Sequence, residues 1–218
     1  MAAAGSIDPA LQAELEGVYA YYASLSRDLD PELGLGGKLL YAGDLDQDGA
    51  RLVRAANIAG AASLTAAGEA QAQRSAIRDG VVDFLVTSLD EALRILKNEI
   101  RKRNGMSVAV TRPHPQLVDE MTVRGVLPDL LRDSEADAAF ASRGAQLVRP
   151  SVMQAGHLLA VIQSPSAEFE QRALTLIPQG DHAARRWLRI SHRYLGPQAR
   201  RIRSVPCDAA IARELVLL

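Results

Sequence analysis

Between residues 38 and 148 the sequence alternates between short apolar runs and longer segments with helical periodicity. The apolar runs consist mainly of Ala, Leu, Val and Ile, a composition typical of strands that are buried on both faces. Strands that alternate with helices indicate crossover connections, which are right-handed and produce a parallel sheet. The alternation therefore predicts an α/β fold built on a doubly wound parallel sheet.

The predicted strands cover residues 38–42, 61–64, 81–86, 107–111, 126–131 and 145–148. The helices between them are predicted at 50–59, 69–78, 117–124 and 135–142, with a further helix that begins after Ser88. Ser88 and Glu91 form an S-x-x-E capping box, which satisfies free N–H groups at a helix start. Gly105 is the expected stop of this helix, because glycine readily adopts a left-handed conformation.

The segments that flank this region have different patterns. Asp8 can cap a helix that has Pro9 at its first position. After residue 150, strands are predicted at 157–163 and 201–205 and helices at 181–195 and 208–217. The chain is therefore divided into an N-terminal helix and linker (1–36), an α/β domain (37–150) and a small α+β C-terminal extension (151–218).

The turn after the first strand, residues 43–49, is where a sheet of this kind binds phosphate. A phosphate loop needs glycines, because the turn is tight and the backbone must approach the anion. Gly43 and Gly49 are present, but Asp44, Asp46 and Asp48 lie between them and would repel a pyrophosphate. One interpretation is an acidic helix start whose carboxylates satisfy the helix dipole.

The same D-x-D-x-D-G spacing resembles the first half of a calcium loop. The twelfth position of such a loop is a glutamate, whereas here it is Ala55. A dinucleotide site also has an acidic residue at the end of the second strand to bind a ribose. The first carboxylate after that strand is Glu69, which is displaced from the expected position. The sequence therefore predicts no metal and gives only weak support for a dinucleotide.

Four segments resemble the urocanase family, which hydrates urocanate with a tightly bound NAD as electrophile. They are GKLLYAG (37–43), AANIAGA (55–61), RDG with LDEAL (78–80 and 89–93) and VRGVLPD (123–129). They occur in the order found in that family's Rossmann-like domain. The resemblance implies a Rossmann-like fold, and NAD or a related nucleotide as the ligand.

The departures from the family limit what the resemblance implies about function. The family's glycine-rich turn is replaced by the acidic turn 43–49, and only Asp133 matches the loop that contacts its cofactor. The positions that carry over as cofactor-binding residues are Gly43, Gly49 and Asp133. A full urocanase is far longer, with its catalytic machinery mostly outside this domain. Urocanate hydration is therefore not supported by the residues present, no catalytic residue is assigned, and a lyase activity would need a further chain or domain.

Histidine and cysteine provide few candidates for chemistry. Cys207 is the only cysteine, so neither an intrachain disulfide nor a thiolate zinc site can form. Arg201 and Arg203 could activate this thiol, or it could be a small buried residue. None of the four histidines is spaced for a helical metal site. His114 follows the fourth strand on the ligand side, where it is either functional or a solvated loop residue.

An arginine-rich segment at residues 172–203 holds eight arginines against one carboxylate, Asp181. Such a segment could bind RNA or an acidic partner, or it could pack against this chain or a second copy. A net charge of −1 and an aromatic content of 4% argue against nucleic acid. The alternative to a nucleotide-binding protein is a non-catalytic interaction or scaffolding module that acts as a homo-oligomer, formed for instance through the helix that contains Trp187.

The sequence begins without the basic region and apolar core of a signal peptide. No apolar run approaches the ~18 residues that a membrane-spanning helix needs. We therefore expect a cytoplasmic protein without a membrane partner.

Overall fold

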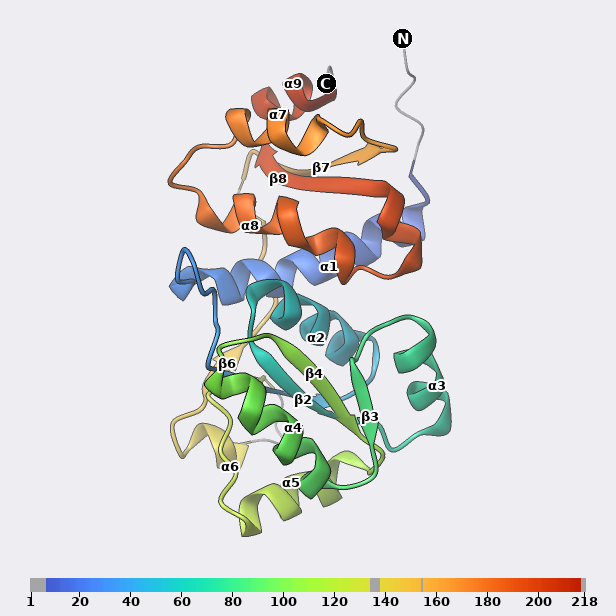
Figure 1. Cartoon of the computed structure of the whole chain (residues 1–218), viewed down its shortest axis with the longest axis vertical. Coiled ribbons are helices and arrows are strands. Elements are labelled where there is room, and N and C mark those ends of the chain that lie inside the picture. The colour runs from blue at the N-terminus through green and yellow to red at the C-terminus, as the bar shows by residue number, and fades with distance from the viewer. Residues whose placement is uncertain (1–6, 134–137, 154, 217–218) are drawn as a thin grey trace.

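The computed structural model describes residues 7–133, 138–153 and 155–216 (Figure 1). A six-stranded sheet has the order β3-β4-β2-β1-β5-β6 with parallel pairing throughout. Its strands are β1 (Leu39–Asp44), β2 (Ala62–Ala66), β3 (Phe84–Val86), β4 (Met106–Val110), β5 (Leu130–Arg132) and β6 (Gln146–Val148). The predicted doubly wound, Rossmann-like α/β fold is confirmed.

Helices cover both faces of this sheet. One face carries α2 (Gln47–Ala59) and α3 (Ala70–Arg78), and the other carries α4 (Leu89–Arg101), α5 (His114–Val123) and α6 (Ala138–Ala141). The chain moves outward from β1 to β3 and then returns through β4 to β5 and β6. Because each crossover is right-handed, this reversal places the later helices on the opposite face.

The helix ends follow local rules with one correction. The Ser88 hydroxyl accepts a hydrogen bond from the Glu91 N–H at the start of α4, as predicted. The prediction that Gly105 stops this helix is wrong, because α4 ends at Arg101 and Arg103 has the positive φ of 59°. Gly105 lies instead against Gly60, whose Cα would be 3.3 Å from an added Cβ. The glycine therefore permits close backbone packing.

Two strands are shorter than their apolar runs predict. β3 begins at Phe84, although Val81 and Val82 are already buried. β5 begins at Leu130, so Pro128 precedes the strand. These residues fill the core from loops, because burial alone does not require pairing in the sheet.

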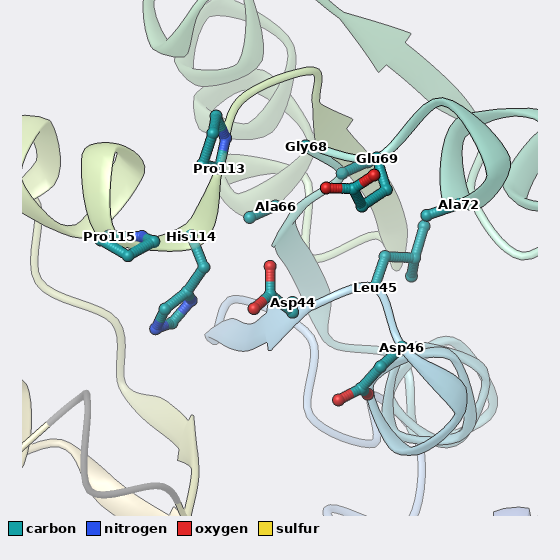
Figure 2. A pocket seen from close by; sticks show the side chains of 11 residues that line it. Asp44, Leu45, Asp46, Ala66, Gly68, Glu69, Ala72, Pro113, His114 and Pro115 are labelled. Atoms are coloured by element: carbon teal, nitrogen blue, oxygen red, sulfur yellow. The ribbon is translucent and has the colours of Figure 1, made fainter.

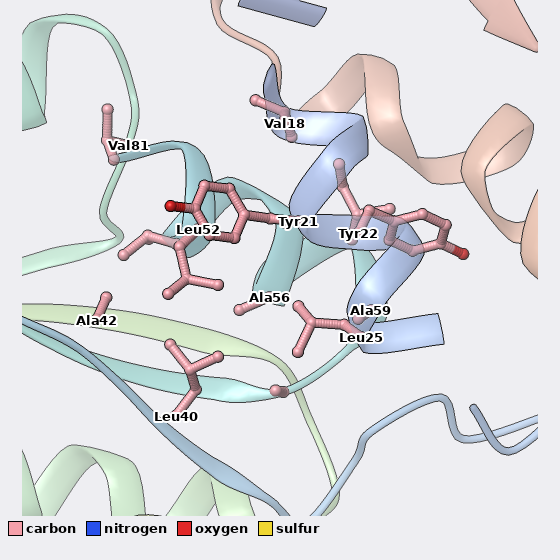
Figure 3. Close-up of a cluster of buried hydrophobic side chains, with 14 of the residues drawn as sticks. Val18, Tyr21, Tyr22, Leu25, Leu40, Ala42, Leu52, Ala56, Ala59 and Val81 are labelled. Carbon is pink, nitrogen blue, oxygen red and sulfur yellow. The ribbon is translucent and has the colours of Figure 1, made fainter. Parts of the chain in front are cut away.

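The first helix, α1 (Pro9–Leu25), lies over α2, on the face of the sheet that carries α2 and α3 (Figure 1). Asp8 caps it by accepting a hydrogen bond from the Ala10 N–H at 2.9 Å, as predicted. Figure 3 shows Tyr21 and Leu25 of α1 on the side of Leu52 and Leu40, whereas the Tyr22 ring points away from them. The Tyr22 hydroxyl donates to the Ala183 carbonyl at 2.9 Å. The N-terminal helix is thus part of the main hydrophobic core.

The C-terminal residues form a smaller α+β layer above α1 (Figure 1). It consists of the antiparallel pair β7 (His157–Gln163) and β8 (Ile202–Asp208) with α7 (Phe169–Leu176), α8 (His182–Ile190) and α9 (Ala209–Val216). The helix α7 was not predicted. The helix predicted to reach Leu195 ends at Ile190 and is followed by a 3₁₀ turn, Ser191–Arg193.

Trp187 of α8 is buried between this layer and α1. Its ring centroid lies 5.1 Å from those of Tyr19 and Tyr22. The Trp187 side chain is covered by the same chain, whereas an oligomer formed through other residues of α8 stays a prediction. Homo-oligomerisation through another surface stays a prediction. Among the described residues, no helix is both long and apolar enough to cross a membrane.

Candidate functional site

A cavity of about 420 Å³ lies over the carboxyl ends of β1, β2 and β4 (Figure 2). After β2 the chain continues to α3 on one face, and after β4 it continues to α5 on the other. This divergence opens the crevice in which doubly wound sheets bind ligands. Its lining residues are Asp44, Leu45, Asp46, Ala66, Ala67, Gly68, Glu69, Ala72, Pro113, His114 and Pro115.

Asp46 is the N-cap residue of α2 and neutralises the helix start from within the chain. Its Oδ1 accepts a hydrogen bond from the Gly49 N–H at 2.7 Å. Arg132, at the end of β5, donates to both oxygens of the same carboxylate at 2.9 and 3.0 Å. Although burial acts to lower it, the hydrogen bond and charge of Asp46 raise the pKa of Arg132 above its ordinary value. The acidic helix start predicted from the sequence is confirmed.

Gly43 lies in β1 beside the crevice. Its φ is +73°, a conformation that L-residues rarely adopt. An added Cβ would lie 3.7 Å from the His114 ring, and the Gly43 carbonyl accepts a hydrogen bond from the Thr65 hydroxyl at 2.8 Å. Gly43 is thus next to a residue that lines the crevice, and its role in cofactor binding stays a prediction.

Gly49 is buried in the first turn of α2 and is not part of the crevice lining. An added Cβ would lie 2.0 Å from the Asp44 carbonyl oxygen. The glycine therefore allows the helix to approach the end of β1 closely, which is one of the roles of glycine in dinucleotide folds. Any contact of this residue with a cofactor stays a prediction.

Asp133 follows β5 and forms an ion pair with Arg149. It does not line the crevice. The rest of the segment matched to the family's cofactor loop, 134–137, lies outside the described residues. None of the three predicted residues lines the crevice, although Gly43 lies beside its lining residue His114 and Gly49 packs against Asp44.

His114 is the first residue of α5 and is buried, so the interpretation as a solvated loop residue is wrong. Its Nδ1 shares a hydrogen bond with the Tyr41 hydroxyl at 2.9 Å. The two rings are stacked, with centroids 5.6 Å apart and planes 13° apart. This contact orients an imidazole at the wall of the crevice.

Asp44 and Glu69 supply carboxylates that have no partner among the described residues. Figure 2 shows Asp44 at the centre of the crevice, between His114 and Glu69. Glu69 occupies the N-cap position of α3, but its side chain makes no capping hydrogen bond. From the sequence, Glu69 is only a displaced acid. The loop after β2 returns it to the crevice, which the spacing alone could not indicate.

Within the described ranges, no group of three or more His, Cys, Asp or Glu side chains could hold a metal ion. The carboxylates that line this crevice can accept hydrogen bonds from hydroxyl or cationic N–H donors.

Cys207 is buried in β8, so it does not begin a helix near activating arginines. Burial, with a smaller contribution from the charge of Asp208, raises the pKa of this thiol to about 11. Since the thiolate is the reactive form, we expect very slow modification of the folded protein by a disulfide reagent at pH 8. The same reagent should react rapidly in denaturant, and fast labelling of the native protein would contradict this expectation.

Comparison with protein families agrees with this geometry. The family model described as the Urocanase Rossmann-like domain matches residues 12–176. The match begins within α1 and ends with α7, so it includes the sheet and every residue of the crevice.

Proposed function

The chain belongs to the urocanase family through its Rossmann-like domain, and we propose that it binds a nucleoside-sized ligand in the crevice. In this proposal the chain does not hydrate urocanate. The proposed ligand carries neighbouring hydroxyl groups and is uncharged or cationic. NAD, the cofactor that the family implies, fits this crevice poorly because of its diphosphate.

The main support for this proposal is that Asp46 both caps α2 and pairs with Arg132. A dinucleotide places its pyrophosphate at the helix N-terminus after the first strand. Here the Asp46 carboxylate already accepts the Gly49 N–H and is bound by both terminal nitrogens of Arg132. An arginine holds a phosphate through the same paired geometry. The chain's own carboxylate therefore takes the position and the partners of the ligand anion.

The remaining part of the crevice suits the sugar and ring of a nucleoside. Asp44 and Glu69 can accept hydrogen bonds from ribose hydroxyls, as the acidic residue after the second strand does in dinucleotide folds. Apolar side chains such as Leu45, Pro113 and Pro115 can pack against a flat ring. A volume of about 420 Å³ is within the range of small-molecule sites.

Titration calorimetry with adenosine, nicotinamide riboside, ADP and NAD tests this proposal. We expect the two nucleosides to bind the wild-type protein, and ADP and NAD to bind about tenfold more weakly or less, because carboxylate and diphosphate repel each other. The substitution Asp46→Ser keeps a capping side chain and frees Arg132. It should raise the affinity for ADP and NAD by about tenfold and leave adenosine binding unchanged.

Asp48→Ser is the matched control. Asp48 lies in the same turn but pairs with Arg51 at 3.4 Å, outside the crevice lining. This variant should bind every ligand like the wild type. Tight binding of NAD by the wild-type protein, or recovery of NAD with the purified chain, would contradict exclusion of the diphosphate. Absence of binding by both nucleosides would contradict the proposed ligand class.

A further inference from the structure

The arginines of the segment 172–203 divide into two groups with different surroundings. Arg185, Arg186 and Arg203 donate hydrogen bonds to main-chain carbonyl oxygens at 2.7 to 3.0 Å. Arg186, for example, bonds the Ile58 carbonyl at the end of α2 and so joins α8 to the sheet domain. Arg185 and Arg186 thus join separate segments of the fold, whereas Arg203 bonds only the carbonyl of its neighbour Ile202.

Arg193 and Arg200 belong to the second group. Together with Arg78 they line a cavity of about 140 Å³ between the end of α3 and the loop that precedes β8. The remaining lining residues are Ile77, Asp79, Gly80, Gly196 and Pro197. Neither Arg193 nor Arg200 forms a salt bridge with a carboxylate among the described residues.

Asp79 is the only carboxylate among those lining residues, and it forms an ion pair with Arg78. Arg78 donates to its two oxygens at 2.9 and 3.0 Å. The hydrogen bond and charge of Arg78 hold the pKa of Asp79 below its usual range. The pair is neutral as a unit, so Arg193 and Arg200 leave the cavity with an excess of positive charge.

A buried cation, Arg54, lies next to the lining of this cavity. Arg54 of α2 is only 7% exposed, and its Nε has no hydrogen-bond partner among the described residues. Its terminal nitrogens bond the carbonyls of Tyr194 and Asp79 at 3.2 and 3.3 Å, without a carboxylate partner. Gly196, which lines the cavity, has a φ of +87°, and an added Cβ would lie 3.1 Å from an Arg54 nitrogen. Arg54 forms no salt bridge, although the charges of Glu14 and Asp79 act on it, and its own positive charge adds to the potential at the cavity.

We propose that Arg193 and Arg200, beside the Arg78–Asp79 pair, form a binding site for a phosphate-sized dianion. Guanidinium groups are the preferred partners of phosphate because their planar donors match its oxygens. The cavity has room for the anion but not for a base and sugar, so any organic part of the ligand would lie in solvent. The ligand is thus inorganic phosphate or the phosphate group of a small monoester.

This site is separate from the nucleoside crevice. The crevice adjoins the start of α3, near Glu69 and Ala72, whereas the anion site adjoins its end, at Arg78. No residue lines both cavities. The two proposals can therefore fail independently.

The test measures phosphate affinity by titration calorimetry at a fixed ionic strength maintained with sodium chloride. Arg193→Gln/Arg200→Gln should weaken binding by about tenfold or more, because charge-assisted hydrogen bonds are lost. Arg189→Gln/Arg201→Gln is the matched control, since both arginines are exposed, lie in the same segment and do not line the cavity. The control changes the net charge equally and should bind phosphate like the wild type.

Further titrations distinguish a free anion from a phosphomonoester as the ligand. Glycerol 3-phosphate that binds more tightly than inorganic phosphate would indicate a phosphomonoester, and the reverse would indicate the free anion. Adenosine binding in both double variants should equal that of the wild type, which separates this test from the crevice. The proposal is overturned if the wild type binds no phosphate or if both double variants lose affinity equally. Retention on RNA that both variants weaken alike would also overturn it, because a diffuse basic surface behaves in that way.

Discussion

Replacement of Trp187 with alanine is expected to lower the free energy of unfolding by about 3–5 kcal/mol. The side chain is fully buried, and its indole N–H donates to the Ser204 hydroxyl at 2.9 Å. Its ring also packs against Tyr19 and Tyr22 of α1. Removal would leave a cavity where α1, α8 and β8 meet, and the surrounding side chains could fill it only in part. Urea denaturation followed by circular dichroism measures the loss.

Two milder variants separate the contributions of this residue. Trp187→Phe keeps an aromatic ring and should cost less than the alanine variant. Ser204→Ala removes one hydrogen-bond partner and should cost about 1–3 kcal/mol, because the buried indole N–H is left unsatisfied. A loss of less than about 1 kcal/mol for Trp187→Ala would show that this contact does not hold the C-terminal layer on the sheet domain.

Replacement of Gly49 with alanine is expected to destabilise the protein by about 1–3 kcal/mol. Helix propensity alone predicts the opposite sign, since alanine in a helix is favoured over glycine by about 1 kcal/mol. The added Cβ would lie 2.0 Å from the Asp44 carbonyl oxygen, so the start of α2 would have to move away from β1. Because Asp46 caps this turn, its hydrogen bond with the Gly49 N–H and its pairing with Arg132 would weaken as well.

Gly17→Ala provides the matched control for this effect. Gly17 is also helical, but an added Cβ would meet only the end of the Arg51 side chain, which can move. This variant should lose less stability than Gly49→Ala in the same urea experiment. If Gly49→Ala were as stable as the wild type, the close approach of α2 to β1 would not explain the glycine.

Gly49 also bears on the family resemblance. The resemblance implies a cofactor-side glycine at this position, and in the structure Gly49 serves the packing of α2 on β1. Arg132 pairs with Asp46 at the same turn. The Rossmann-like scaffold of the urocanase family is thus retained, and in the proposed function the Asp46 carboxylate takes the place of a ligand diphosphate.

Local sequence signals predicted the helix starts where a capping side chain was recognised. Asp8, Ser88 and Asp181 each precede a predicted helix and accept a hydrogen bond from an N–H group two or three residues further on. Such bonds depend on a few neighbouring residues, so the sequence contains all the information. By contrast, α2 and α5 begin at Gln47 and His114, three residues before the predicted starts at 50 and 117. Strand ends were less predictable, because Val81 and Val82 are apolar for burial and not for pairing. The helix α7 was missed because its eight residues depend on packing, with Phe169 and Ala173 buried.

By itself the sequence determined the parallel sheet, because buried strands alternating with helices have few other arrangements. It also determined the acidic character of the turn after β1. Only the tertiary structure decided how that turn is used. Arg132 reaches Asp46 from 86 residues away, and Tyr41 meets His114 across 73 residues. Contacts over such separations depend on which strands become neighbours, and a linear pattern does not specify the partners that those neighbours bring together.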